Sequence, residues 1–373
     1  MNIKSHPSRA AYLCGSSYWC AQGRSCGSHR FGSAENPFAP PAFRTAHGLG
    51  QPRALPYFAA FPAELATLAQ LCGWIESEIR QAAATAGWHE NELAGLPIFL
   101  GSTSYVMSDR EAAPPERAGD ERFTLCEIAG YLKNRFASEN VFSFATSCTS
   151  SAQALLAAAR SIENGLAERA LVVGFESFNR LTFEHFHAMN LLETEPGRLP
   201  FRNAGGLVLG EGAAVLTLSA RPHRDYACRL RGLAAQTDHA NLTAASAEPL
   251  HRLLAESLCR AGISAQDLRG VKTHGSGGLS DTVEMQVREA LWPHTPALLF
   301  KPYIGHTLGA GAALETALLL DALQHGRLPP LPAAAPDFPL PTLHGRPLPN
   351  GSYLNYFLGF GGSHCAWLLD WQA

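Results

Sequence analysis

Cys148 is the residue whose setting most favours covalent chemistry. It lies in the segment Thr146–Ala152, where small hydroxylated residues precede an alanine-rich stretch with helical spacing. A thiol at the start of a helix lies near the positive end of the helix dipole, which stabilises the thiolate and makes it a better nucleophile at neutral pH. Backbone N–H groups at the same turn can bind a developing oxyanion. The alternative is a small buried cysteine that fills a gap in the core.

Two histidines stand in comparable settings. His274 precedes Gly275-Ser276-Gly277-Gly278, and His306 follows Gly305 and precedes Thr307-Leu308-Gly309-Ala310. Taken alone, each would be an ordinary core or capping histidine. The small residues beside them allow another group to approach closely. One cysteine together with two such histidines predicts covalent acyl transfer.

Three other candidate motifs are weaker. Cys14, Cys20 and Cys26 are evenly spaced, but structural zinc sites use closer pairs and a fourth ligand, so scattered thiols are the simpler interpretation and no metal is expected. Residues 205–212 lack the glycine spacing of a dinucleotide site, and no organic cofactor is expected. Residues 359–362 form a glycine turn with one aromatic side chain, whose plain interpretation is a hairpin or bulge.

Each chemically capable turn comes before a long apolar helix. Residues 142–148 predict a strand and a tight turn, 149–165 an alanine-rich helix and 170–174 a buried strand. Residues 298–306 and 307–326 repeat the strand, turn and helix. Both helices are apolar on nearly every side, which is typical of central helices. The repetition predicts an α/β fold built from two duplicated halves, residues 1–220 and 226–373.

The region before residue 142 is less regular. Residues 11–22 could open with a short strand, the spacing of apolar residues predicts a helix over 62–87, and 97–100 predict a short buried strand. Residues 23–56 are rich in Gly, Pro, Ser and Arg and predict an irregular segment. The polar stretch 109–122 predicts a surface loop.

Composition excludes several classes of protein. The 373 residues are 46% hydrophobic and only 16% charged, against about 25% charged in average proteins. Such a chain can bury a large core and a subunit interface. The net charge of -3 does not predict a nucleic-acid partner, and no run of 18 apolar residues predicts a membrane span. Nine cysteines, an odd number, and the lack of an apolar N-terminal run predict reduced thiols in the cytoplasm.

Together these blocks resemble the condensing enzymes of fatty-acid and polyketide synthesis, in their Cys-His-His branch. The segment around Cys148 resembles the family's nucleophile motif. His274–Gly277, with Asp281 and Glu284 behind it, resembles the HGTGT…D…E motif, with Gly278 where Thr is usual. The remaining blocks occur in family order: 199–212 resembles RPFD…GEG with Arg202 in place of Asp, Lys301–His306 with Gly309 and Glu315 resembles K…GH…G…E, and 355–362 resembles NSFGFGG with one extra residue.

The resemblance implies a thiolase-like, five-layered αβαβα fold and a β-ketoacyl synthase. Cys148 would take an acyl group from an acyl carrier protein, with the N–H groups of Cys148 and Phe360 as oxyanion hole and Phe360 as gate. His274 and His306 would donate through Nε2 to a malonyl thioester, and Lys301 with Glu315 would support them. The resemblance also implies a homodimer, or a heterodimer with a ketosynthase-like subunit. Carrier-protein docking is expected at Arg198 and Arg202.

Three alternatives remain open at this point. The chain could be a partner subunit like the chain-length factors, although those lack the cysteine that this chain retains. It could be a thiolase or another acyltransferase, because Cys365 lies near the glycine turn and a thiolase needs a second reactive cysteine. It could be a binding module without chemistry. The compact length and the divergent region before Cys148 are similar to ketosynthases of aryl-polyene-type pigment pathways.

Overall fold

The fold was analysed in a computed structural model. The structure describes residues 9–25, 31, 39–48, 50–113, 125–202, 205–332 and 338–373. Its main feature is an 11-stranded sheet in the order β12-β11-β13-β14-β10-β1-β9-β7-β5-β6, with β2 paired to β1. The strands on the N-terminal side are β1 (Ala11–Cys20), β2 (Gly23–Arg24), β5 (Ile98–Gly101), β6 (Val141–Phe144), β7 (Arg169–Glu176) and β9 (Gly212–Ser219). Those on the C-terminal side are β10 (Ala227–Thr237), β11 (Leu268–Lys272), β12 (Ala297–Leu298), β13 (Gly351–Leu358) and β14 (Ser363–Gln372).

The strand order shows that the two halves are duplicates. Going outward from the junction, the N-terminal side runs β1-β9-β7-β5-β6 and the C-terminal side runs β10-β14-β13-β11-β12, so each half places its first and last strands innermost. The two halves meet where β1 and β10 pair antiparallel at Ala11↔Leu230 and Tyr12↔Arg229. β9 ends at Ser219 and β10 begins at Ala227. The division at residues 220 and 226 stays a prediction.

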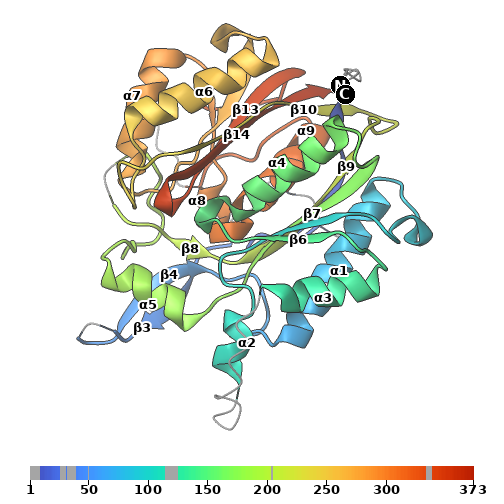
Figure 1. The fold of residues 1–373 in the computed structure, drawn as a ribbon. Coiled ribbons are helices and arrows are strands. Elements are labelled where there is room, and N and C mark those ends of the chain that lie inside the picture. The colour runs from blue at the N-terminus through green and yellow to red at the C-terminus, as the bar shows by residue number, and fades with distance from the viewer. Residues whose placement is uncertain are drawn as a thin grey trace.

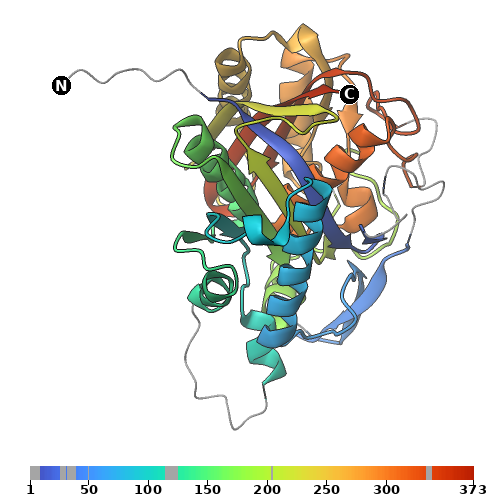
Figure 2. The same ribbon diagram turned by 90° about the vertical axis from the view of Figure 1, so that its right-hand side faces the viewer.

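Helices separate and cover the two halves of the sheet, which gives the expected five layers (Figures 1 and 2). The central layer holds α4 (Ser150–Glu163) and α9 (Gly311–Gln324), which contact each other. α1 (Leu68–Thr85) and α3 (Cys126–Arg135) cover one outer face, and α6 (Ala247–Ala261) and α7 (Ser280–Leu291) cover the other. All 13 residues of α9 from Gly311 to Leu323 are buried, as expected for a helix that lies between two sheet layers.

A smaller sheet and two short helices lie beside the central layer. The sheet has the order β3-β4-β8, with β3 at Ala42–Ala46, β4 at Arg53–Phe58 and β8 at Leu209–Gly210. α2 (Met107–Ala112) and α5 (Arg180–Ala188) flank it, and α8 (Lys301–Ile304) precedes the central α9.

Two expectations for the N-terminal region were wrong. Residues 23–56 are not irregular throughout, because they contain β2, β3 and most of β4. The Pro56 within β4 hid this strand, whose Leu55 and Tyr57 are buried against the aromatic side chains of Phe178 and Phe183. Residues 109–112 belong to α2, and the rest of that predicted loop, from 114 to 122, lies outside the described residues.

Candidate active site

Cys148 lies in a tight turn between β6 and α4. The turn Ser147–Thr149 is a single 3-10 turn, and Ser147 adopts a left-handed conformation with φ 55°. Hydroxyl groups hold this turn: Ser150 Oγ accepts from the Thr146 N–H at 3.0 Å and donates to the Ser147 carbonyl at 2.6 Å. The small hydroxylated residues noted in the sequence therefore fix the backbone that presents the thiol, as their type predicts.

Burial reduces the acidity of this thiol in the resting protein. Cys148 is 5% exposed, and burial raises its pKa to about 11. The backbone N–H of Phe360, which hydrogen-bonds the sulfur, and the positive charge of Lys301 act in the opposite direction. The expectation of an activated thiolate at this helix start stays a prediction.

His306 is held by its backbone and by its ring. Its N–H donates to the Val208 carbonyl at 2.7 Å, and its carbonyl accepts from the Gly210 N–H at 3.1 Å. A Cβ at Gly210 would lie 2.1 Å from the Ile304 carbonyl oxygen, so only glycine permits this approach. The ring Nδ1 accepts the Leu308 N–H at 3.0 Å. Burial and the charge of Lys301 keep the pKa of His306 well below its ordinary value.

His274 has a matching environment in the other half of the sheet. It follows β11, and its Nδ1 accepts the Leu358 N–H from β13 at 3.4 Å. Its own N–H donates to Glu284 at 2.9 Å. Burial and the neighbouring Lys301 hold the pKa of His274 well below its ordinary value. Because a neutral imidazole that accepts through Nδ1 carries its proton on Nε2, each of the two histidines has an Nε2–H donor.

One cavity of about 340 Å³ brings the predicted chemical groups together. Cys148, His274, His306 and Phe360 all line it, and the two imidazole centroids are 5.3 Å apart with the rings nearly perpendicular. The other lining residues come from three segments, 189–207, 243–245 and 276–280, and from the end of β13 with the start of β14. Cys365 is fully buried in β14 and does not line this cavity.

Lys301 and Glu315 form the expected buried pair, and the structure adds a second lysine to it. Lys301 Nζ is 2.7 Å from Glu315 Oε1 and 2.7 Å from the backbone carbonyl of His274. Lys272 Nζ is 2.7 Å from the other oxygen of the same carboxylate. The pair therefore contacts the backbone of His274 directly.

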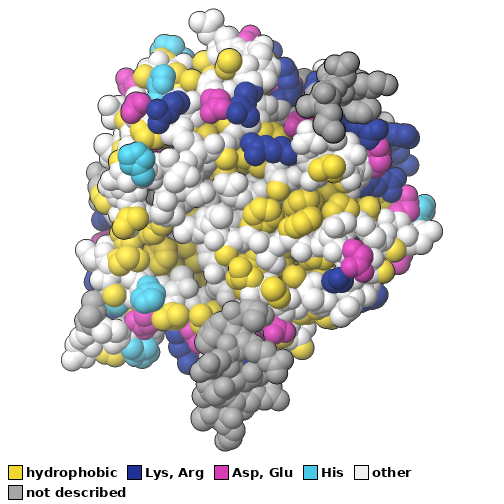
Figure 3. Space-filling view, viewed as in Figure 1, with side chains coloured by type: hydrophobic (Ala, Val, Ile, Leu, Met, Phe, Trp, Pro, Cys, Tyr) yellow, Lys and Arg dark blue, Asp and Glu magenta, His cyan; other side chains and the backbone are white. Residues whose placement is uncertain are grey.

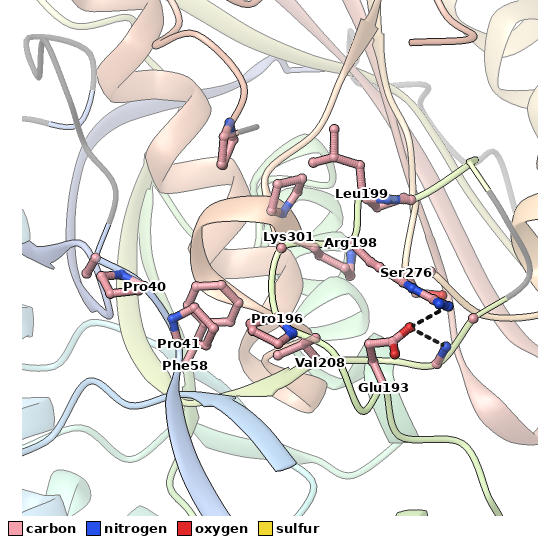
Figure 4. Close-up of a pocket in the computed structure, with 18 residues that line it drawn as sticks. Pro40, Pro41, Phe58, Glu193, Pro196, Arg198, Leu199, Val208, Ser276 and Lys301 are labelled. Carbon is pink, nitrogen blue, oxygen red and sulfur yellow. Dashed lines mark hydrogen bonds and ion pairs between the residues drawn. The ribbon is translucent and has the colours of Figure 1, made fainter. Parts of the chain in front are cut away.

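One docking candidate, Arg198, lines a second cavity of about 300 Å³, which shares Gly205 and Ser276 with the first (Figure 4). Its walls are mostly proline and glycine, and Arg198 lies along one side. The Arg198 guanidinium pairs with Glu193 at 3.2 Å and Glu195 at 3.6 Å, and its side chain is 47% exposed. Arg202 is exposed in the following turn.

Three buried polar residues near the site were not singled out from the sequence. Glu176, at the end of β7, accepts the Gly309 N–H at 2.9 Å and so anchors the turn after His306. His364 lines the cavity, is 2% exposed and lies 3.9 Å from Asp238. Lys272 ends β11. A charged residue at the end of an apolar strand was the available signal for Glu176 and Lys272.

Of the other cysteines that the sequence singled out, the three in the described part of the chain are buried. Cys14 and Cys20 are buried, and burial raises the pKa of each to about 12. Burial raises the pKa of Cys365 to about 12 as well. Cys26, the third member of the evenly spaced set, lies outside the described residues. No described helix is both long enough and apolar enough to cross a membrane.

A shielded thiol that faces two neutral histidines, at the junction of two duplicated α/β halves, is the arrangement of an acyl-transferring condensing enzyme with a thiolase-like fold. Sequence comparison agrees: the β-ketoacyl synthase N-terminal domain matches residues 70–223 and the C-terminal domain matches 227–334. The chain belongs to the β-ketoacyl synthase family.

Relatives come from both fatty-acid and polyketide synthesis. The chain is 30% identical to putative polyketide beta-ketoacyl synthase 1 of Streptomyces cyaneus, covering 71% of this chain and 68% of that one. It is 28% identical to 3-oxoacyl-[acyl-carrier-protein] synthase 2 of Rhizobium meliloti, covering 77% of each. Some relatives are far longer, since the match spans 4% of the polyketide synthase ThaG of Burkholderia thailandensis.

The fold is also that of a solved ketosynthase. A ketosynthase in complex with its chain length factor, from Xenorhabdus doucetiae, superposes with a TM-score of 0.75 at 22% identity. The superposition covers 99% of this chain and 100% of the other. This likeness confirms the thiolase-like fold that the resemblance implied.

The raised pKa of Cys148 predicts its reactivity with alkylating reagents. Below its pKa of about 11 the thiolate fraction grows about tenfold for each pH unit, so carbamidomethylation of Cys148 should keep accelerating from pH 7 to 9.5. Peptide mass spectrometry resolves Cys148 from the exposed Cys126 and Cys259, which serve as internal controls. A rate plateau for Cys148 below pH 8 would show that the free enzyme already holds a thiolate.

Proposed function

We propose that the protein catalyses decarboxylative condensation of an acyl thioester with malonyl carrier protein. The observation that carries the proposal is the pair of Nε2–H donors, on His274 and His306, that line one cavity with Cys148. Two convergent donors can bind a single thioester carbonyl and stabilise the enolate that forms there. The relatives named 3-oxoacyl synthase and polyketide ketosynthase support the same reaction.

In the first half-reaction Cys148 attacks the acyl thioester. A C–S bond forms at the acyl carbon, the bond to the carrier sulfur breaks, and the thiol proton leaves with the carrier thiol. The oxyanion would accept hydrogen bonds from the N–H groups of Cys148 and Phe360, both at the cavity.

In the second half-reaction His274 and His306 donate to the malonyl thioester carbonyl. The bond to the terminal carboxylate breaks, carbon dioxide leaves, and the electron pair becomes the enolate. The enolate carbon then attacks the acyl-cysteine carbonyl, forms the new C–C bond and expels the Cys148 thiolate. The buried site protects the acyl-enzyme from hydrolysis, since Cys148 and both histidines are at most 6% exposed.

Eight described cysteines, all free, are consistent with a reducing cytoplasmic location.

The two half-reactions should separate under mutation. Cys148→Ala should abolish acyl-enzyme formation, whereas Cys148→Gln should lose condensation and keep or gain decarboxylation, because its amide mimics the acylated residue. His306→Ala should still self-acylate and should lose about 10²–10³ in decarboxylation rate, or roughly 3–4 kcal/mol. Intact mass and labelled carbon dioxide release measure the two steps, with Cys365→Ala as the matched control.

Two results would contradict this assignment. Acylation of another thiol in Cys148→Ala at the original rate would move the nucleophile. Normal decarboxylation by His306→Ala, together with lost acylation, would show that His306 serves the thiol instead of the enolate.

We also propose a dimer that pairs along β6. Among the described strands β6 pairs only with β5, so in the described part of the chain its other edge has no strand partner. Phe142 on β6 is 45% exposed and Leu125 beside it is 42% exposed. Figure 3 shows hydrophobic side chains gathered over this side of the molecule. An open, apolar strand edge is a template for pairing with another chain, either a second copy or a ketosynthase-like subunit.

If the dimer pairs along β6, a charge placed on that strand should weaken it. Phe142→Asp should shift the protein from dimer toward monomer in light scattering at micromolar concentration, because the new charge would be buried on pairing. Phe43→Asp is the matched control, since Phe43 is 54% exposed on β3, away from this edge. A wild-type chain that is monomeric and fully active would contradict the dimer.

Carrier-protein docking is proposed at Arg198 and Arg202. Carrier proteins of this class are acidic, so an arginine rim should accelerate encounter. Arg198→Glu with Arg202→Glu should raise the carrier-protein KM about three- to tenfold at low salt and less at high salt. Arg252→Glu, on the outer helix α6, is the control. An unchanged KM at low salt would place docking elsewhere.

A further inference from the structure

Lys272 is a fully buried cation that the proposed mechanism does not use. It is the last residue of β11, two residues before His274, and its side chain is 0% exposed. Its Nζ lies 2.7 Å from Glu315 Oε2 and 3.2 Å from the centroid of the Phe357 ring. A buried ammonium requires a compensating anion and ligating groups, and these two contacts supply them.

The Glu315 contact connects Lys272 to the backbone of His274. Each oxygen of the Glu315 carboxylate has one lysine: Oε2 accepts from Lys272, and Oε1 accepts from Lys301. Lys301 Nζ also donates to the His274 carbonyl at 2.7 Å. Without Lys272 the carboxylate would keep a buried oxygen with no donor, and would be expected to rotate toward Lys301 and draw it away from His274.

The Phe357 contact connects Lys272 to the ring of His274. Phe357 precedes Leu358 on β13, and the Leu358 N–H is the donor that His274 Nδ1 accepts. The Phe357 ring stacks on Trp367 at 5.2 Å on its other side, so the ammonium and Trp367 together fix the end of β13. Lys272 therefore contacts the supports of both the backbone and the ring of His274.

We propose that Lys272 is a positioning residue for His274, whose ammonium fixes the Glu315 carboxylate and the Phe357 ring and thereby sets the direction of the Nε2–H donor. This role rests on the proposed decarboxylative condensation, in which that donor contacts the malonyl carbonyl. Lys272 lines neither of the two cavities at the site, so it acts only through these neighbours.

The charge of Lys272 has a second effect on the histidines. It is one of the positive charges that lower the pKa of both His274 and His306. The other ionisable groups around this cluster are Lys301 on α8, Glu315 on α9, Asp281 and Glu284 on α7, Tyr356 on β13 and His364 on β14. Burial lowers the pKa of Lys272 to about 7, so it is charged in acid. Removing it removes repulsion from each imidazolium, and the acid limb of activity should move to higher pH.

The test is Lys272→Met, assayed for decarboxylation of malonyl carrier protein. We expect kcat to fall about ten- to a hundredfold, because a displaced donor costs rates of this order. KM should stay within about twofold, since Lys272 is remote from the docking surface and the cavities. Val271→Ala is the matched control: it perturbs the same strand on the opposite face, where Val271 is buried among α6 and α7 residues, and should leave kcat and the pH profile unchanged.

A second variant keeps the proposal testable if Lys272→Met does not fold. Phe357→Leu retains Lys272 and Glu315 but removes the ring, and should lower kcat about three- to tenfold with KM unchanged. Folded Lys272→Met, or otherwise Phe357→Leu, with wild-type kcat and acid limb would overturn the proposal. Wild-type protein that releases no carbon dioxide would instead refute the proposed function, so the two failures are distinguishable.

Discussion

The chemistry of this protein depends on backbone N–H groups that donate to the Nδ1 atoms of two buried histidines. Leu308 supplies the donor for His306 and Leu358 supplies it for His274. Burial and the nearby lysines keep both imidazoles neutral, so each must carry its proton on Nε2. A group that accepted a hydrogen bond from Nδ1 would move the ring proton from Nε2 to Nδ1, and the Nε2–H donor would be lost. Three other features hold the two imidazoles in place. They are the close backbone approach at Gly210, the buried carboxylates of Glu284 and Glu315, and the lysine pair Lys272 and Lys301.

The duplicated fold explains why the two donors and the thiol meet. In each half a tight turn leads into a central helix, and these two helices, α4 and α9, contact each other in the middle layer. Ser147 and Leu308, at the starts of the corresponding turns, both adopt left-handed backbone conformations, with φ of 55° and 45°. Such strain persists where the surrounding structure determines the backbone. The third group, His274, enters from the end of β11 and completes the cavity.

Much of the site was predictable because its chemistry depends on residue type and local spacing. Cys148, His274 and His306 stand in short motifs, and both central helices are apolar on nearly every side. The supporting contacts were harder to predict. Lys272 and Glu315 are 43 residues apart and meet only through the tertiary fold. The acidity of Cys148 was hard to predict because burial, which depends on the whole fold, raises its pKa. β4 was missed because Pro56 lies within it, and because its partner strand β8 and its aromatic contacts are distant in sequence.

The central claim is that both histidines are neutral Nε2–H donors in the resting enzyme. Nitrogen-15 NMR of ¹⁵N-histidine-labelled protein, with His274→Ala and His306→Ala for assignment, measures this directly. The account predicts that both rings stay neutral and protonated at Nε2 from pH 8 down to at least pH 6, below the ordinary histidine pKa of 6.5. Protonation of either ring at or above pH 6.5, or a proton on Nδ1, would contradict it.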